Sequence, residues 1–153
     1  MAASASGLGA LPVEHPLSLG LVQRGGTYQA NHACRQADVM LALGVRFDDR
    51  TSSSWIPGYS FTIPPTRLIH VDIDPEEIGR NYPVALGLMA DVRTFLRQIL
   101  VELDRRGHDG APPDKRGKWL DAIDGYRREW DAFVAPGMTD DSTPINPQRA
   151  AVE

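Results

Sequence analysis

The sequence contains little cysteine, no long apolar run and no surplus of basic charge. Cys34 is the one cysteine among 153 residues, so no internal disulfide can form, and its thiol is interpreted as a small buried hydrophobe in a reducing, cytoplasmic setting. There is no stretch of 18 apolar residues, and the start lacks a charged segment followed by an apolar run, so neither a membrane span nor a signal peptide is expected. A net charge of −4 provides no basic surface for nucleic acid or for an acidic membrane.

Motifs that identify common catalytic and phosphate-binding sites are also absent. The sequence has neither GxGxxG nor GxxxxGK(S/T). No histidine has a serine, cysteine or carboxylate at a spacing that would indicate a catalytic triad. Asp48 and Asp49 are adjacent, but no third ligand accompanies them, so a metal site is not expected. No catalytic residue and no metal ligand is therefore predicted.

Three short apolar runs predict β-strands. They cover residues 39–44 (VMLALG), 67–74 (RLIHVDID) and 84–90 (VALGLMA). Continuous apolar runs of this length are typical of strands that are buried on both faces of a parallel sheet. Helical patterns alternate with the runs, which predicts an α/β fold with a doubly wound parallel sheet. His70 lies inside the second run and is interpreted as a hydrogen-bonded core histidine.

Two longer helices are predicted around these strands. Residues 27–37 carry small side chains at helical spacing, which suits close packing on a sheet. Residues 91–103 begin with Asp91 as the N-cap and carry an apolar stripe that is expected to pack on the sheet. The stripe consists of Val92, Phe95, Leu96, Ile99, Leu100 and Leu103.

A short third helix is expected over residues 75–80. Asp74 and Glu77 have the spacing of an acidic capping box, and Pro75 would occupy the first helical position. The segment between the first two strands is rich in proline, so it is expected to be a long loop with a functional or packing role.

The two ends of the chain have a different character. Residues 1–26 are rich in Gly, Ala, Ser and Pro, and are expected to form a loop with short ordered pieces. A polar linker over 104–114 precedes a helix at about 115–133, and the tail resembles an extended connector. The helix carries an apolar face that we expect to be buried in a core or an interface, made of Trp119, Ile123, Tyr126, Trp130 and Phe133.

Polar residues at the carboxyl ends of the strands predict a ligand site, because open parallel sheets bind ligands there. Arg46 and Arg50 have the guanidinium groups that suit a diphosphate, and Asp72 can accept hydrogen bonds from sugar hydroxyls. Gly25 and Gly26 would allow a ligand to approach the backbone ahead of a helix. The alternative is that the two arginines form a solvated ion-pair cluster with the neighbouring aspartates.

Four motifs in this order resemble the central domain of acetolactate synthase large subunits, a family of thiamine-diphosphate-dependent enzymes. They are GLGALP, HPLSLG, GVRFDDR and LIHVDIDPEEIGRN, and the resemblance covers roughly residues 7–103. It implies a Rossmann-like domain of which this chain holds a part, without the N-terminal strands. It also implies an FAD site lined by Gly25, Gly26, Gly44, Arg46, Asp48, Arg50, Asp72, Ile73, Glu77, Ala90 and Asp91.

The resemblance also implies how the chain is organised. Residues 1–104 would be a truncated central domain, residues 105–135 a linker and an amphipathic helix, and residues 136–153 a connector toward a diphosphate-binding domain. The catalytic glutamate and the motif that binds thiamine diphosphate and magnesium are not found in the sequence, so these cofactors are expected only in a full-length parent. The family has Met-His-Gly where this chain has Arg24-Gly25-Gly26, so FAD is expected to bind weakly or not at all.

The leading hypothesis is thus a non-catalytic central-domain fragment with a structural and subunit-contact role. Its parent would decarboxylate and join 2-oxo acids in branched-chain amino acid synthesis. Self-association and binding to catalytic domains of such an enzyme are the expected partnerships, without nucleic acid or membrane. Two alternatives remain open: a subunit of a split enzyme, and a free-standing nucleotide-binding module.

Overall fold

The computed structural model describes residues 1–107 and 113–150. The chain divides into two compact units, Met1–Pro112 and Pro113–Glu153. The first unit holds all the strands of the described chain, and the second is helical.

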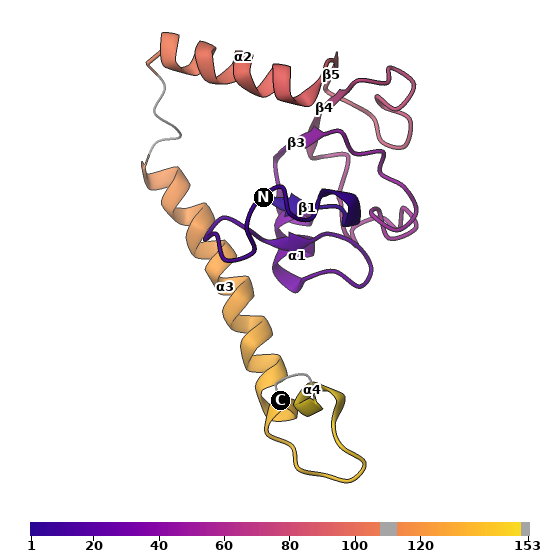
Figure 1. The fold of residues 1–153 in the computed structure, drawn as a ribbon, viewed down its shortest axis with the longest axis vertical. Helices are drawn as coiled ribbons and strands as arrows, with labels where there is room; N and C mark the ends of the chain where they lie inside the picture. Colours follow the sequence, from indigo (N-terminus) through magenta and orange to yellow (C-terminus); the bar gives the residue numbers. More distant parts are fainter. Residues whose placement is uncertain (108–112, 151–153) are drawn as a thin grey trace. The chain divides into compact units, whose positions relative to one another are not determined.

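The main sheet of the first unit has three parallel strands, as the apolar runs predict. They are β3 (Val39–Leu43), β4 (Arg67–Asp72) and β5 (Leu86–Met89), with β4 in the centre (Figure 1). Because the strands are parallel, their carboxyl ends share one edge of the sheet, where the loops that follow β3 and β4 begin. The predicted α/β fold class with a parallel sheet is confirmed.

A second, smaller parallel sheet was not predicted. It pairs β1 (Ala2–Ala3) with β2 (Gly20–Leu21), and a 3-10 turn, η1 (Ala5–Gly7), follows β1. Strands of two residues are too short to show any periodicity, so the sequence predicts only short ordered pieces there. The expectation of a loop with such pieces is confirmed.

Helix α1 (Tyr28–Gln36) matches the predicted helix over 27–37. Ala30 and Ala33 are buried at 0% and 3% exposure, so the small side chains do allow close packing. The helix contacts β1 and β2. Thr27 precedes α1, and its hydroxyl donates to the carbonyl of Leu19, just ahead of β2.

The core of the first unit includes residues on both faces of β4, and part of it lies under the loop that follows β3. Leu68 and Val71 of β4 are fully buried. Phe47 contacts Phe61, His70 and Tyr82 edge-to-face, with ring centroids 5.3 to 5.4 Å apart. Edge-to-face packing of aromatic rings is favourable, and here it joins the loop after β3 to the main sheet.

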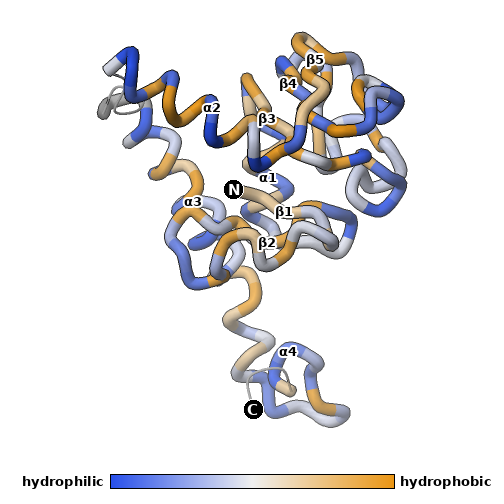
Figure 2. The backbone as a smooth tube through the Cα atoms, turned by 45° about the horizontal axis from the view of Figure 1, so that its top comes forward, coloured by the Kyte–Doolittle hydropathy of each residue, from blue (hydrophilic) through white to orange (hydrophobic). Residues whose placement is uncertain are grey.

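Helix α2 (Val92–Arg105) is present, but the prediction that its stripe is buried is wrong, because none of the six members is fully buried and three are exposed. Asp91 caps the helix as expected, because its carboxylate accepts the Thr94 N–H at 2.8 Å. Leu96, Leu100 and Leu103 are nevertheless 37%, 60% and 40% exposed. Figure 2 shows apolar positions recurring along α2. Periodicity identifies an apolar side of a helix but not what covers it. The half-buried members of the stripe are Val92, Phe95 and Ile99.

The helix predicted over residues 75–80 is also wrong, because this segment forms consecutive turns. The carboxylate of Asp74 accepts the N–H of Glu76, and the Asp74 N–H donates to the carboxylate of Asp72. The Glu77 N–H donates to the Asp74 carbonyl, but the Glu77 side chain does not accept the Asp74 N–H, so no capping box forms. The Glu77 side chain pairs with Arg80 instead. Local carboxylate-to-backbone hydrogen bonds thus compete successfully with a helix.

The second unit contains α3 (Pro113–Met138) and the short α4 (Pro147–Ala150), which contacts it. The predicted helix at 115–133 lies within α3, and α4 interrupts the tail that was predicted to be extended. Ile123 is buried, whereas Trp119, Trp130 and Phe133 are 41%, 42% and 71% exposed. The apolar face is therefore not a closed core, and its role in an interface stays a prediction. Among the described helices, none has the length and hydropathy needed to cross a bilayer.

Candidate functional site

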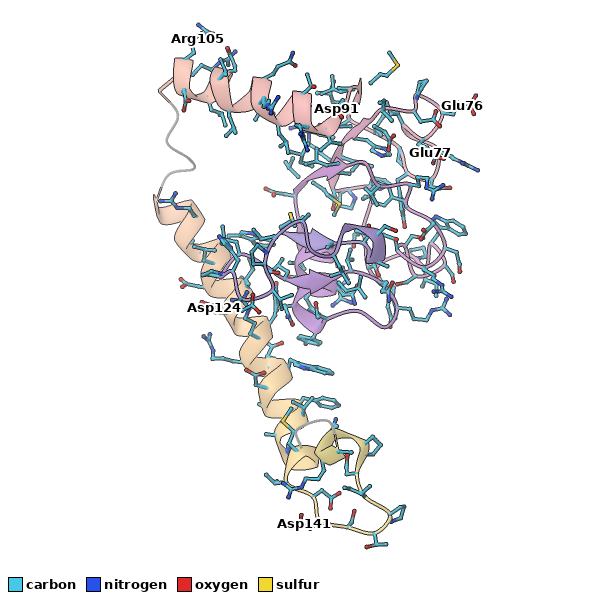
Figure 3. The ribbon with its side chains drawn as sticks, in the orientation of Figure 1. Glu76, Glu77, Asp91, Arg105, Asp124 and Asp141 are labelled. Carbon is cyan, nitrogen blue, oxygen red and sulfur yellow. The ribbon has the colours of Figure 1, made fainter. Side chains whose placement is uncertain are left out.

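A cleft of about 370 Å³ lies where the loop after β3 meets the turns after β4. Three of the predicted ligand-site residues, Arg46, Asp48 and Glu77, line it. Figure 3 shows Glu76 and Glu77 on the segment between β4 and β5, away from the capping residue Asp91 at the start of α2. The other residues of the lining are Asp49, Trp55, Arg80 and Asn81.

Glu77 is the polar group of this cleft whose bonding is incomplete. The residue is only 8% exposed, and its Oε1 accepts a hydrogen bond from Arg80 at 2.9 Å. Its Oε2 is buried and has no hydrogen-bond partner within the described part of the chain. A buried carboxylate oxygen without a partner is destabilising, and such an oxygen in a native structure calls for an explanation. A ligand N–H or O–H donated to Oε2 would supply the missing bond.

The wall formed by the loop after β3 is held in an uncommon conformation. Phe47 has a φ of 51°, and Trp55 has a φ of 53°. The indole N–H of Trp55 donates to the Phe47 carbonyl at 3.0 Å, and the Asn81 side-chain amide donates to the Arg46 carbonyl at 2.9 Å. Non-glycine residues in this region of φ are uncommon and cluster at functional sites.

Asp49, Trp55, Arg80 and Asn81 were missed as site residues. All four lie in irregular segments, where no periodicity marks an inward-facing side chain. The signal available in the sequence was the loop length, since a long loop inside a compact domain is often functional.

Asp48 has a structural task in this wall. Its carboxylate accepts the Thr51 N–H at 2.8 Å, which closes the turn that follows. This hydrogen bond, assisted by the nearby Arg46 charge, lowers the pKa of Asp48 below 3.8. Hydrogen bonds to the charged form of a carboxylate favour that form. The residue is thus anionic at neutral pH and already engaged with the backbone.

A second cleft, of about 320 Å³, collects two further predicted residues, Gly25 and Arg50. A Cβ added at Gly25 would meet nothing within 4 Å, so the backbone there is open to approach. A Cβ at Gly26 would lie 2.2 Å from the Leu21 carbonyl oxygen, so this glycine is required by the close approach of its own chain. The remaining lining residues are Gln23, Arg24 and Asp49, the last of which also lines the first cleft.

The other predicted site residues lie outside both clefts. Gly44 immediately follows β3 and has a φ of 60°, and Ile73 is 71% exposed. Asp72 is 7% exposed, and its carboxylate accepts the Asp74 N–H at 3.0 Å. Asp91 caps α2 and Ala90 immediately precedes it, with the Ala90 N–H bonded to the Asp72 carbonyl. Three of the four predicted carboxylates, Asp48, Asp72 and Asp91, therefore bind backbone amides.

The arginine–aspartate alternative has no direct contacts to support it. Among the ion pairs found in residues 1–107 and 113–150, none joins Arg46 or Arg50 to Asp48 or Asp49. The influence of Arg46 on Asp48 is electrostatic and acts without an ion-pair contact. Nor do the described histidine, cysteine and acidic residues form a cluster of three that could hold a metal ion.

The interpretation of His70 as a hydrogen-bonded core histidine is confirmed. Its Nδ1 accepts the Gly79 N–H at 3.4 Å, so Nε2 carries the proton and donates to the Val45 carbonyl at 2.9 Å. The ring therefore joins the loop after β3 to the turns after β4. Cys34, predicted to be buried, is half-buried in the structure. Its partial burial still raises the pKa of the thiol to about 12, which suits an unreactive thiol.

Comparison with known proteins assigns the family. The model of the family described as "Thiamine pyrophosphate enzyme, central domain" matches residues 1–99. The chain belongs to this family. The Rossmann-like resemblance and the acetolactate synthase motifs in the sequence are thereby confirmed.

Curated relatives agree with the family assignment. The probable acetolactate synthase large subunit of Methanocaldococcus jannaschii is 35% identical over 143 residues, which are 94% of this chain and 22% of the relative. The acetolactate synthase isozyme 3 large subunit of Escherichia coli K12 is 37% identical over 124 residues, 81% of this chain and 21% of the relative. Acetolactate synthase 1 of Zea mays is 39% identical over 124 residues, which are 81% of this chain and 18% of the relative. The chain thus spans about a fifth of the length of these relatives.

Proposed function

We propose that this chain is a non-catalytic central-domain module of an acetolactate synthase-like enzyme, with a structural and subunit-contact role. The observation that carries the proposal is the match of residues 1–99 to the central domain of thiamine pyrophosphate enzymes. The parent reaction would be the decarboxylation and joining of 2-oxo acids. Thiamine diphosphate and magnesium would bind to other domains of such an enzyme.

The contacts of the candidate polar groups support a structural role. Asp72 and Asp91 bind backbone amides at the ends of β4 and β5, and His70 bridges two loops. Each of these groups stabilises the carboxyl edge of the main sheet. A side chain whose hydrogen bonds hold the backbone is poorly placed to exchange protons with a substrate.

The direct test is an activity assay on the purified full chain. Pyruvate, thiamine diphosphate, magnesium and FAD are supplied together, and acetolactate is measured against a reaction without protein. We expect no acetolactate above that control, whereas the E. coli isozyme 3 large subunit, assayed in parallel, serves as the positive reference. Acetolactate produced by the chain alone would overturn the non-catalytic assignment.

A second candidate function, nucleotide binding, is favoured by the unpartnered Oε2 of Glu77. The adjoining Arg46 would attract a phosphate, and Oε2 would accept from a sugar hydroxyl or a base amine. The residues present fit part of a dinucleotide, since Gly44, Asp72 and Asp91 lie outside the cleft. FAD is therefore expected to bind weakly or not at all, and a smaller nucleotide would fit the cleft better.

Titration distinguishes these ligands. Quenching of flavin fluorescence by the protein should not saturate in the low micromolar range, and adenosine diphosphate is titrated in parallel by calorimetry. Any binding should weaken in Glu77→Gln, which places an amide donor where an acceptor is needed, and persist in the matched control Glu76→Gln, whose side chain is exposed. A preparation that keeps flavin through gel filtration would contradict the weak-FAD expectation, and equal effects of both variants would remove Glu77 from the site.

A further inference from the structure

Helix α2 presents an apolar surface that the first unit leaves uncovered. Leu96, Leu100 and Leu103 follow one another at steps of four and three residues, so they lie on one side of the helix. They form what is called here the leucine ridge, with exposures of 37%, 60% and 40%. Three large apolar side chains that are aligned and exposed differ from the scattered apolar residues normal on a surface.

Charged residues of both signs flank the leucine ridge on one side. Arg93 and Arg97 belong to the N-terminal half of α2, and Asp104 belongs to its last turn. All three are exposed, and none of them takes part in an ion pair among the residues that the structure describes. Arg93 and Arg97 do help to lower the pKa of Asp91 at the N-cap. The flank is thus positive at one end and negative at the other.

We infer that the leucine ridge docks against α2 of a second copy of this chain, with the two helices antiparallel. In that arrangement Leu96 lies beside the partner's Leu103, and each ridge covers the other. At a rise of about 1.5 Å per residue, this alignment places Asp104 within about 3 Å, along the axis, of the partner's Arg93 and of the partner's Arg97. The contact is made twice, because a two-fold interface repeats every interaction.

The charge pattern selects this occupant and this direction. In a parallel pairing about a two-fold axis, the charged flanks lie on opposite sides of the helix pair, so Asp104 would not meet the partner's Arg93 or the partner's Arg97. A membrane or another surface of a single sign would attract one end of the flank and repel the other. Only a partner with the opposite order of charge matches both ends, and the same helix turned end to end has that order. The inference rests on the subunit-contact role proposed above and names the surface that performs it.

The test is sedimentation velocity on the full chain over a range of concentrations, comparing two matched variants of α2. Leu100→Gln removes apolar contact from the ridge, while Val101→Gln makes a similar change at a position 69% exposed. Val101 lies about 100° around the helix from Leu100, off the ridge. Glutamine is a good helix former, so both variants should fold, which circular dichroism checks. We expect the wild type to associate, Leu100→Gln to weaken association roughly tenfold or more, and Val101→Gln to match the wild type.

Charge reversal separates a pairing effect from a folding effect. Asp104→Lys should weaken association severalfold, and so should Arg93→Glu combined with Arg97→Glu. All three changes in one chain restore the attraction between the flanks, so association should return toward the wild-type value. If the single and double variants weakened association by damaging the fold, their effects would add in the triple variant, and association would not recover.

Three results would overturn the inference: a wild type that is monomeric at every concentration, equal effects of Leu100→Gln and Val101→Gln, or no recovery in the triple variant. A monomer that also makes no acetolactate would defeat the docking surface and leave the non-catalytic assignment in place. Acetolactate synthesis by the chain would defeat that assignment whatever the state of association.

Discussion

The different burial of Leu68 and Leu96 predicts unequal effects of the same substitution. Leu68 belongs to the central strand β4 and is 1% exposed, whereas Leu96 belongs to α2 and is 37% exposed. Leu68→Ala loses the transfer free energy of the removed carbons and leaves a cavity, so it should lower the free energy of unfolding by about 3 kcal/mol. Leu96→Ala removes carbons that are only partly buried and leaves no closed cavity, so about 1 kcal/mol is expected.

Amide hydrogen exchange in β4 measures this difference without interference from the helical second unit. Every 1.4 kcal/mol is a factor of ten, so opening of the first unit should quicken about 100-fold in Leu68→Ala and about 5-fold in Leu96→Ala. The measurement is made at a dilution where the chain does not associate. Equal acceleration in the two variants would refute the reasoning, because it would show that Leu96 faces a closed core. The aspartate variant Leu96→Asp, which the apolar periodicity alone would mark as unfolding the chain, is now expected to fold.

Two further predictions concern titrating groups of the first unit. Hydrogen bonds from Thr94 lower the pKa of Asp91 below 3.8, so the cap stabilises α2 above that pH and is lost as the pH falls through the lowered pKa. Asp91→Ala should therefore speed amide exchange in the first turn of α2 at neutral pH, with the difference from wild type shrinking in acid, while Asp91→Asn keeps most of the cap; a difference independent of pH would contradict this. Cys34, whose pKa burial raises to about 12, should resist iodoacetamide at about pH 8 until urea unfolds the chain. Rapid alkylation of the native protein, seen by mass spectrometry, would contradict the raised pKa of this half-buried thiol.

Much of the main sheet was predictable because its strands are buried. A buried parallel strand must be apolar along its whole length, and this leaves a continuous run in the sequence. The runs at 39–44, 67–74 and 84–90 each contain one observed strand. The capping aspartate of α2 was predictable for a similar reason, since its effect is confined to three neighbouring residues.

The errors arose where two local structures compete or where the covering surface is remote. Residues 74–77 satisfy the pattern of a capping box, yet the Asp74 N–H is already bonded to the carboxylate of Asp72. That bond favours a turn over a helix, and spacing alone does not reveal it. The exposed half of the α2 stripe is the second case, because periodicity is the same whether a core or another molecule covers the helix.

The candidate site shows the same limit in its carboxylates. Asp72, Asp91 and Glu77 all lie near the carboxyl ends of parallel strands, and from the sequence each is an equally good acceptor for a ligand. In the structure, the three carboxylates differ in whether a backbone N–H group lies within reach. Aspartate is short enough to reach an amide two or three residues further on, and both aspartates do so. Glutamate is longer and carries its carboxylate beyond its own backbone, so only one oxygen of Glu77 finds a partner, in Arg80. The other oxygen, Oε2, has no partner and is the atom that a ligand would have to bind. For this reason, comparing Glu77→Gln with its control Glu76→Gln is the sharpest test of ligand binding in the cleft.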